Sequence, residues 1–134
     1  MPLDELVVTA HNTIEGLIVE LARNPSTPGV VPQLRENLAR EIGIGPQCLA
    51  DAAAGRGGDA TARRLDAVGA QGRLLAERVR HHDPTEFEAL RRAIDDHFAE
   101  EAAVAKELVD EFPDDAGSMG SAYGKARDQR LYQL

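Results

Sequence analysis

The chain has 134 residues, about the size of one domain, and a net charge of −8 from 15 Lys and Arg against 23 Asp and Glu. This charge repels phosphate backbones and anionic lipid head groups, which argues against nucleic acid as a partner. The single cysteine excludes an internal disulfide, and no apolar run reaches the roughly 18 to 20 residues that a membrane helix needs.

The overall composition favours helices throughout the chain. Alanine, leucine, glutamate and arginine dominate, and consecutive β-branched residues are rare, which predicts an all-α fold. The amino-terminal stretch lacks the basic and apolar regions of a signal peptide, so we expect a cytoplasmic protein.

Apolar periodicity, prolines and glycines predict four helices, over residues 3–23, 32–54, 59–80 and 84–112. The first should end at the stretch 24–29, which contains two prolines and a glycine. The second should be interrupted at Gly43, Gly45 and Pro46.

Capping residues indicate where the third and fourth helices begin. Asp59 is a candidate N-cap for the third helix. Asp83, Pro84 and Glu86 supply the N-cap, the first-turn proline and the third-position glutamate of the fourth. We therefore expect a four-helix bundle over residues 1–113.

The remaining carboxy-terminal residues do not continue the bundle pattern. Residues 114–120 are predicted to form a linker, and residues 121–134 are predicted to form a mobile tail or a short docking helix. The predicted domain organisation is thus a bundle over 1–113 followed by a linker and tail over 114–134.

Each predicted helix has one unusual residue on or near its apolar face. An advance of 100° per residue gives these positions as His11, Gly45, Gly72, and His97 together with Glu101. Four helices with short connections form an antiparallel up-down-up-down bundle, in which the first and fourth helices lie side by side. His11 can then lie level with His97 and Glu101, and the two glycines should leave an interior hollow facing them.

The hollow would be lined by residues from three helices. The two glycines would form part of its wall, together with the side chains of Leu49, Cys48 and Ile14. An apolar hollow of this kind raises the pKa of a carboxyl group unless a cation lies beside it, whereas imidazole titrates near neutrality. The sequence therefore predicts a pocket in which an acid and a base face a small ligand.

Over about residues 3–112 the chain resembles a bacterial hemerythrin-like (HHE) domain. His11 matches the histidine near the middle of that family's first helix, and His97 followed by Glu101 matches the histidine and carboxylate of its last helix. The resemblance implies an antiparallel four-helix bundle that holds a non-haem di-iron centre.

The other ligand positions of that family are replaced in this chain. Its second helix should present His-x-x-x-Glu and its third a histidine, and these positions correspond here to Gly45, Leu49 and Gly72. Half of the ligand set is absent, so we expect neither a di-iron centre nor oxygen carriage.

The first functional hypothesis is a repurposed bundle that binds and transforms a small organic molecule without a cofactor. His97 and Glu101 would form an acid–base pair, and His11 would be a second proton donor or acceptor. Isomerisation, elimination or cyclisation by an isomerase, lyase or cyclase would suit such a site.

Two alternatives stay open at this point. His11, His97 and Glu101 form a 2-His-1-carboxylate set that could hold one iron or zinc ion. The chain could instead be a non-catalytic ligand-binding or interaction module, whose acidic surface and tail contact a partner. A homodimer is compatible with either of these two alternatives.

Overall fold

The computed structural model describes residues 1–23, 30–81 and 84–132, and within these ranges the chain is helical and contains no β-strand. Its α-helices are α1 (Leu3–Arg23), α2 (Val30–Ala53), α3 (Gly58–Arg80), α4 (Phe87–Glu111) and α5 (Ala116–Tyr132). Two short 3-10 helices, η1 (Pro84–Glu86) and η2 (Pro113–Asp115), precede α4 and α5. None of the helices in these ranges is both long and apolar enough to cross a membrane. The all-α prediction is confirmed.

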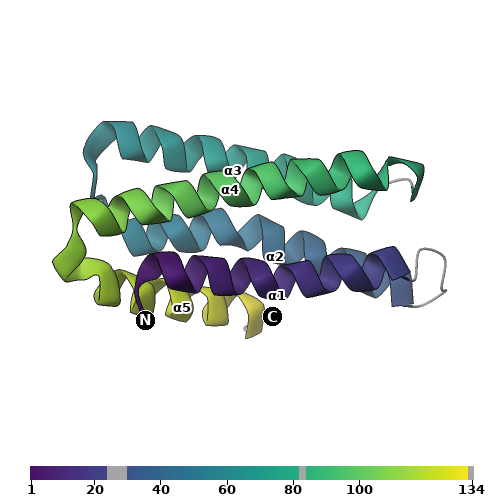
Figure 1. The fold of residues 1–134 in the computed structure, drawn as a ribbon, viewed down its shortest axis with the longest axis horizontal. Coiled ribbons are helices and arrows are strands. Elements are labelled where there is room, and N and C mark those ends of the chain that lie inside the picture. Colours follow the sequence, from purple (N-terminus) through teal and green to yellow (C-terminus); the bar gives the residue numbers. More distant parts are fainter. Residues whose placement is uncertain (24–29, 82–83, 133–134) are drawn as a thin grey trace.

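Helices α1 to α4 lie lengthwise beside one another (Figure 1). Helix α1 packs against α2 and α4, and α3 packs against the same two helices. The end of α1 and the start of α2 lie at one end of the molecule, whereas the end of α2 and the start of α3 lie at the other (Figure 1). This arrangement places one face of each helix toward a common interior.

The interior holds two apolar clusters that meet near the middle of the helices. One lies toward the chain's amino terminus and includes Leu3, Val7, Leu49, Val104 and Leu108, and the other includes Ile14, Ile18, Ile42, Leu75 and Ile94. Within each helix the buried side chains recur at spacings that fit the 3.6-residue period, which places them on one face. The apolar periodicity from which the four long helices were predicted therefore corresponds to their buried faces.

Helix α2 is continuous, so the predicted interruption is wrong. It passes through Gly43, Gly45 and Pro46 without a break. Pro46 removes one helical hydrogen bond, but α2 packs against α1, α3 and α5, and such tertiary contacts provide most of a helix's stability. A Cβ at Gly72 of α3 would lie 3.0 Å from Cγ of Pro46, so the missing side chain makes room for the proline ring.

The helix starts differ from those predicted by a few residues. Helix α3 is preceded by Gly57, which has a φ of 86°, and not by an Asp59 N-cap. Residues 84–86 form the 3-10 turn η1 before α4 begins at Phe87. The predicted breaker stretch 24–29 and the predicted cap Asp83 lie outside the described residues.

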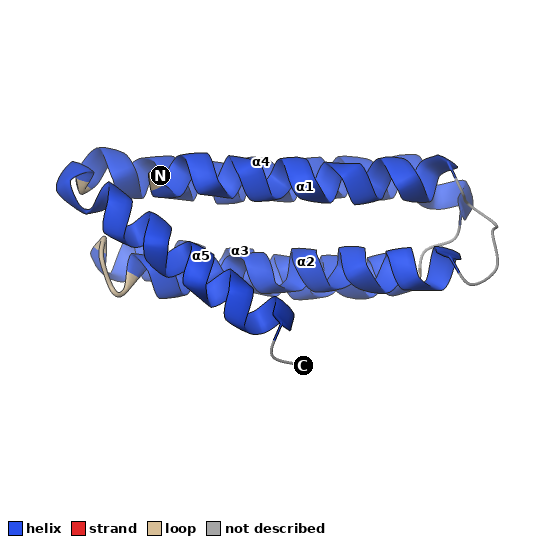
Figure 2. Ribbon diagram, turned by 90° about the horizontal axis from the view of Figure 1, so that it is seen from below, coloured by secondary structure: helices blue, strands red, loops and turns tan. Residues whose placement is uncertain are grey.

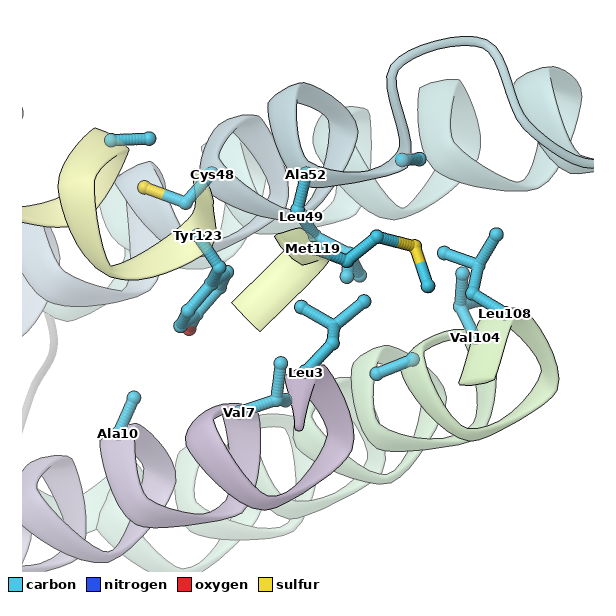
Figure 3. Packing of buried hydrophobic residues seen from close by; sticks show 13 residues of the cluster. Leu3, Val7, Ala10, Cys48, Leu49, Ala52, Val104, Leu108, Met119 and Tyr123 are labelled. Carbon is cyan, nitrogen blue, oxygen red and sulfur yellow. The ribbon is translucent and has the colours of Figure 1, made fainter. Parts of the chain in front are cut away.

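The carboxy-terminal residues form helix α5, so the linker predicted over 114–120 is wrong. Helix α5 crosses α2 obliquely and packs against α1 and α2 (Figure 2). Met119 and Tyr123 of α5 enter the first apolar cluster beside Leu3 and Cys48 (Figure 3). Glycines interrupt the apolar face of this helix, so the sequence shows no clear apolar periodicity there. The alternative of a docking helix is the one that the structure supports.

Alanine substitutions at Gly43 and Gly57 test whether each glycine has the backbone conformation described here. Gly43→Ala should raise the free energy of unfolding by about 0.5–1 kcal/mol, because alanine loses less backbone entropy than glycine in a helix. A Cβ at Gly43 would meet only Cβ of Ala76, at an ordinary 3.8 Å. Urea unfolding followed by circular dichroism measures the change.

Gly57→Ala is the matched control for that substitution. It should destabilise the fold, because Gly57 has a left-handed backbone and a Cβ there would lie 2.1 Å from Oγ1 of Thr61. Equal effects of the two alanines would contradict the assignment of Gly43 to an unstrained helical position.

Candidate functional site

A buried carboxylate lies between two histidines at the centre of the bundle. Glu101 of α4 is 2% exposed. Its Oε2 lies 3.1 Å from Nε2 of His11 on α1, and its Oε1 lies 2.7 Å from Nε2 of His97, one turn earlier on α4. We call His11, Glu101 and His97 the triad. The structure therefore brings together the three ionisable residues that the sequence singled out.

The charge of Glu101 is set by its two neighbours. Burial raises the pKa of the Glu101 carboxyl, but hydrogen bonding and charge from His11 and His97 lower it by more. The net pKa lies below the ordinary value of 4.5, so the carboxylate is ionised at neutral pH. An ionised carboxylate only accepts hydrogen bonds, and His11 Nε2 must therefore be the donor.

A fourth residue, Gln71 of α3, holds the far side of the His97 ring. Its Oε1 lies 2.9 Å from His97 Nδ1, and an amide oxygen can only accept, so Nδ1 carries a hydrogen. The other ring nitrogen, Nε2, is buried with no well-directed hydrogen bond, although Glu101 Oε1 is close. We therefore describe the contact between His97 and Glu101 as an ion pair.

The 2.7 Å contact between His97 Nε2 and Glu101 Oε1 depends on whether a proton lies between the two atoms. An unprotonated ring nitrogen and a carboxylate oxygen are both acceptors and repel at this distance. The contact is favourable when a proton lies on His97 Nε2, so that an imidazolium balances the charge of Glu101. A buried charge balanced in this way avoids much of the cost of an isolated carboxylate.

His11 is the member of the triad that reaches the surface. Its side chain is 12% exposed, whereas that of His97 is fully buried. The His11 ring stacks on Phe98 with the ring centres 4.1 Å apart and the planes 9° apart. In the neutral ring, whose Nε2 donates to Glu101, the lone pair lies on the remaining nitrogen, Nδ1. It bonds to no residue that the structure describes.

The space that we expected to be a hollow is occupied by the triad itself. A Cβ at Gly45 would lie 3.1 Å from Glu101 Oε2 and 3.2 Å from Oε1, so the carboxylate fills the room beside that glycine. A Cβ at Gly72 would lie 3.3 Å from the His97 ring. The predicted interior hollow is therefore corrected, because the charged groups occupy the space beside both glycines.

The other predicted lining residues are packed in the core. Leu49 and Cys48 belong to the first apolar cluster, near Tyr123 (Figure 3), and Ile14 belongs to the second. Burial raises the pKa of the Cys48 thiol to about 11, so it stays protonated. Their assignment to the lining of a ligand pocket stays a prediction.

Helix α5 adds a residue that the sequence reasoning did not place near the site. Burial raises the pKa of the Tyr123 hydroxyl, and the negative charge of Glu101 raises it further. The phenol is therefore neutral and within electrostatic range of the carboxylate. No periodic signal identified it, because the predicted linker ended only three residues before Tyr123.

The triad contains the donor set of the one-metal alternative, which stays a prediction. Within the described ranges, no group of three or more His, Cys, Asp or Glu side chains is arranged to hold a metal ion. Each imidazole of the triad faces a different oxygen of Glu101.

Gln71 is the functional residue that sequence reasoning missed. It lies beside Gly72 on α3, and the antiparallel packing of α3 on α4 places it opposite His97. Only the register between these helices reveals the contact, and a single sequence does not contain that register.

Comparison with known proteins adds no family assignment. No protein-family model matches the chain, and no curated protein or solved structure is significantly similar to it.

Proposed function

We propose that the protein is a hemerythrin-like, antiparallel up-down-up-down bundle whose former metal position has become a metal-free acid–base site for a small organic molecule. His11 is the base in this proposal, because its Nδ1 lone pair is unused and its side chain reaches the surface. The observation that carries the proposal is the 3.1 Å contact between His11 Nε2 and the buried Glu101 carboxylate.

Glu101 has the role of a positioning residue. By accepting the Nε2 hydrogen it holds His11 in the tautomer that exposes the Nδ1 lone pair, and its charge stabilises the imidazolium that forms when Nδ1 takes a proton. His97, held by Gln71, lies 2.7 Å from the other oxygen of the same carboxylate and helps to hold it in place.

A substrate would reach His11 from the groove between α1 and α4. A hollow of about 430 Å³ opens there, lined by Asp4, Glu5, Val8, Thr9, Ala102 and Lys106. Val8 lies one turn before His11, and Ala102 follows Glu101 directly. Val8 and Ala102 give the groove an apolar wall beside acidic groups, which suits an apolar molecule with a removable proton.

The proposal can be tested with a generic proton-abstraction probe. A nitrobenzisoxazole loses its ring C–H proton to a base while its N–O bond breaks, and the product is a coloured phenolate. The purified protein should accelerate this reaction beyond an equal concentration of imidazole, and His11→Gln should lower the rate about 100-fold. The absorbance of the phenolate measures the rate.

His81→Gln is the matched control, because the His81 side chain is 77% exposed at the end of α3. It should leave the rate unchanged, and circular dichroism should show that both variants are folded. A protein no faster than imidazole, or an equal loss in both variants, would contradict the role of His11. A rate that is lost in chelator and restored by iron or zinc would favour the one-metal alternative.

A further inference from the structure

A second groove runs between α3 and α4, on the far side of His97 from His11. Its hollow has a volume of about 350 Å³ and is lined by Gln71, Leu74, Leu75, Arg78, Ala93 and Asp96. A neighbouring hollow of about 380 Å³ shares Leu74 and Arg78 with it. We call the first hollow the α3–α4 groove. Leu74 is 71% exposed there, so its side chain is accessible to a ligand in the groove.

The α3–α4 groove holds one positive and one negative group that are not paired. Arg78 and Asp96 form no ion pair or hydrogen bond with the residues that the structure describes. The nearby acid Glu77 is bound instead to Arg80 and His81. A ligand carrying both charges would therefore find a partner for each.

The two charges lie toward opposite ends of the groove. Gln71 of α3 contacts His97 of α4, and Arg64 contacts Glu107, so the two helices run in opposite directions. Asp96 is next to His97 in the chain and therefore lies near Gln71. Arg78 is seven residues further along α3, about 10 Å at 1.5 Å per residue.

The floor between the two charges is apolar. Leu74 and Leu75 lie between Gln71 and Arg78 along α3, and Ala93 faces them from α4. A ligand that spans the groove must therefore have an apolar middle and charged ends, since burying methylene groups there is favourable and burying a polar chain is not.

From these observations we infer that the α3–α4 groove binds a small linear zwitterion, an ω-amino acid with a polymethylene chain. Its carboxylate pairs with the Arg78 guanidinium, which suits bidentate contacts with carboxylates. Its ammonium pairs with Asp96, and its methylenes cover Leu74 and Leu75. This binding does not depend on the proposed base His11.

Gln71 connects such a ligand to the triad. Its Oε1 accepts from His97 Nδ1, and its side chain also lines the α3–α4 groove beside Asp96. A bound ligand therefore touches the residue that holds the His97 ring. Binding should shift the NMR signal of the His97 Nδ1 proton.

Calorimetry with the full chain tests the inference, with ω-aminohexanoate, hexanoate and hexylamine as ligands. The aminohexanoate should bind about three- to fivefold more tightly than either single-charge analogue, the size of effect expected for an exposed ion pair. Affinity should fall for ω-aminobutanoate, because the shorter chain cannot reach both charges.

Two variants test separately whether Arg78 binds the ligand carboxylate and whether Asp96 binds the ligand ammonium. Arg78→Gln should remove the advantage of aminohexanoate over hexylamine, and Asp96→Asn should remove its advantage over hexanoate. Arg92→Gln and Asp95→Asn are controls, because these exposed charges lie outside the groove lining, and they should change neither comparison.

Several results would overturn the inference. These are undetectable binding of aminohexanoate at millimolar concentration, equal affinities for the three ligands, and unchanged selectivity in both groove variants. His11→Gln should leave binding unaltered, so a failure of the proton-abstraction proposal is distinguishable from a failure of this site.

Discussion

Replacing Glu101 with alanine should lower the free energy of unfolding by about 3–5 kcal/mol, the usual cost of removing one partner from a buried ion pair. The substitution leaves the fully buried His97 without its counter-charge and removes the hydrogen-bond acceptor of His11. Urea denaturation at neutral pH measures the effect.

The neighbouring residue provides a matched control. Glu100 is 49% exposed and pairs with Arg64 at the surface, where such pairs contribute about 0–1 kcal/mol. Glu100→Ala should therefore cost about 1 kcal/mol or less. Similar losses in the two variants would show that the Glu101 carboxylate is not buried as described.

The same carboxylate predicts how stability depends on pH. The pKa of Glu101 is lower in the folded protein than its ordinary value of 4.5, so the unfolded chain takes up the proton first as pH falls. The stabilisation by Glu101 is complete above about pH 4.5 and is lost as pH falls through the folded-state pKa. Glu101→Gln should remove this part of the pH dependence, up to about 1.4 kcal/mol per pH unit. An unchanged acid profile would contradict the lowered pKa.

Much of the fold could be predicted from the sequence, because long helices with a clear 3.6-residue period identify their own buried faces. Ile94 and Leu108 of α4, for example, lie on the same periodic face, and both are buried. Helix α5 could not be predicted in the same way. Its buried residues Met119 and Tyr123 are separated by glycine, alanine and serine, and its helical state depends on packing against α1 and α2.

The candidate site was predictable in its members but not in its packing. Glu101 and His97 were recognised because a charged residue on an apolar face needs a partner. The sequence shows that Gly45 and Gly72 lack side chains, but only coordinates show which groups occupy the space. Gln71 was missed because its role depends on the register of α3 against α4.

The packing beside Gly72 predicts the second large effect on stability. A Cβ at Gly72 would lie 3.0 Å from Pro46 Cγ and 3.3 Å from His97 Cε1. Neither neighbour can move freely. Pro46 is a rigid ring inside α2, and the His97 ring is held at one nitrogen by Gln71 and at the other by Glu101.

Gly72→Leu should therefore lower the free energy of unfolding by about 1–3 kcal/mol, the usual cost of overpacking a core. Gly69→Leu is the matched control, one turn earlier on α3, where a Cβ would meet only the mobile end of Arg73 at 3.6 Å. It should stabilise the protein by about 0.5–1 kcal/mol through the gain in helix propensity. Urea unfolding of the two variants decides the question, because the predicted changes have opposite signs. If Gly72→Leu were as stable as Gly69→Leu, the space beside His97 would be open, and the hollow predicted from the sequence would exist after all.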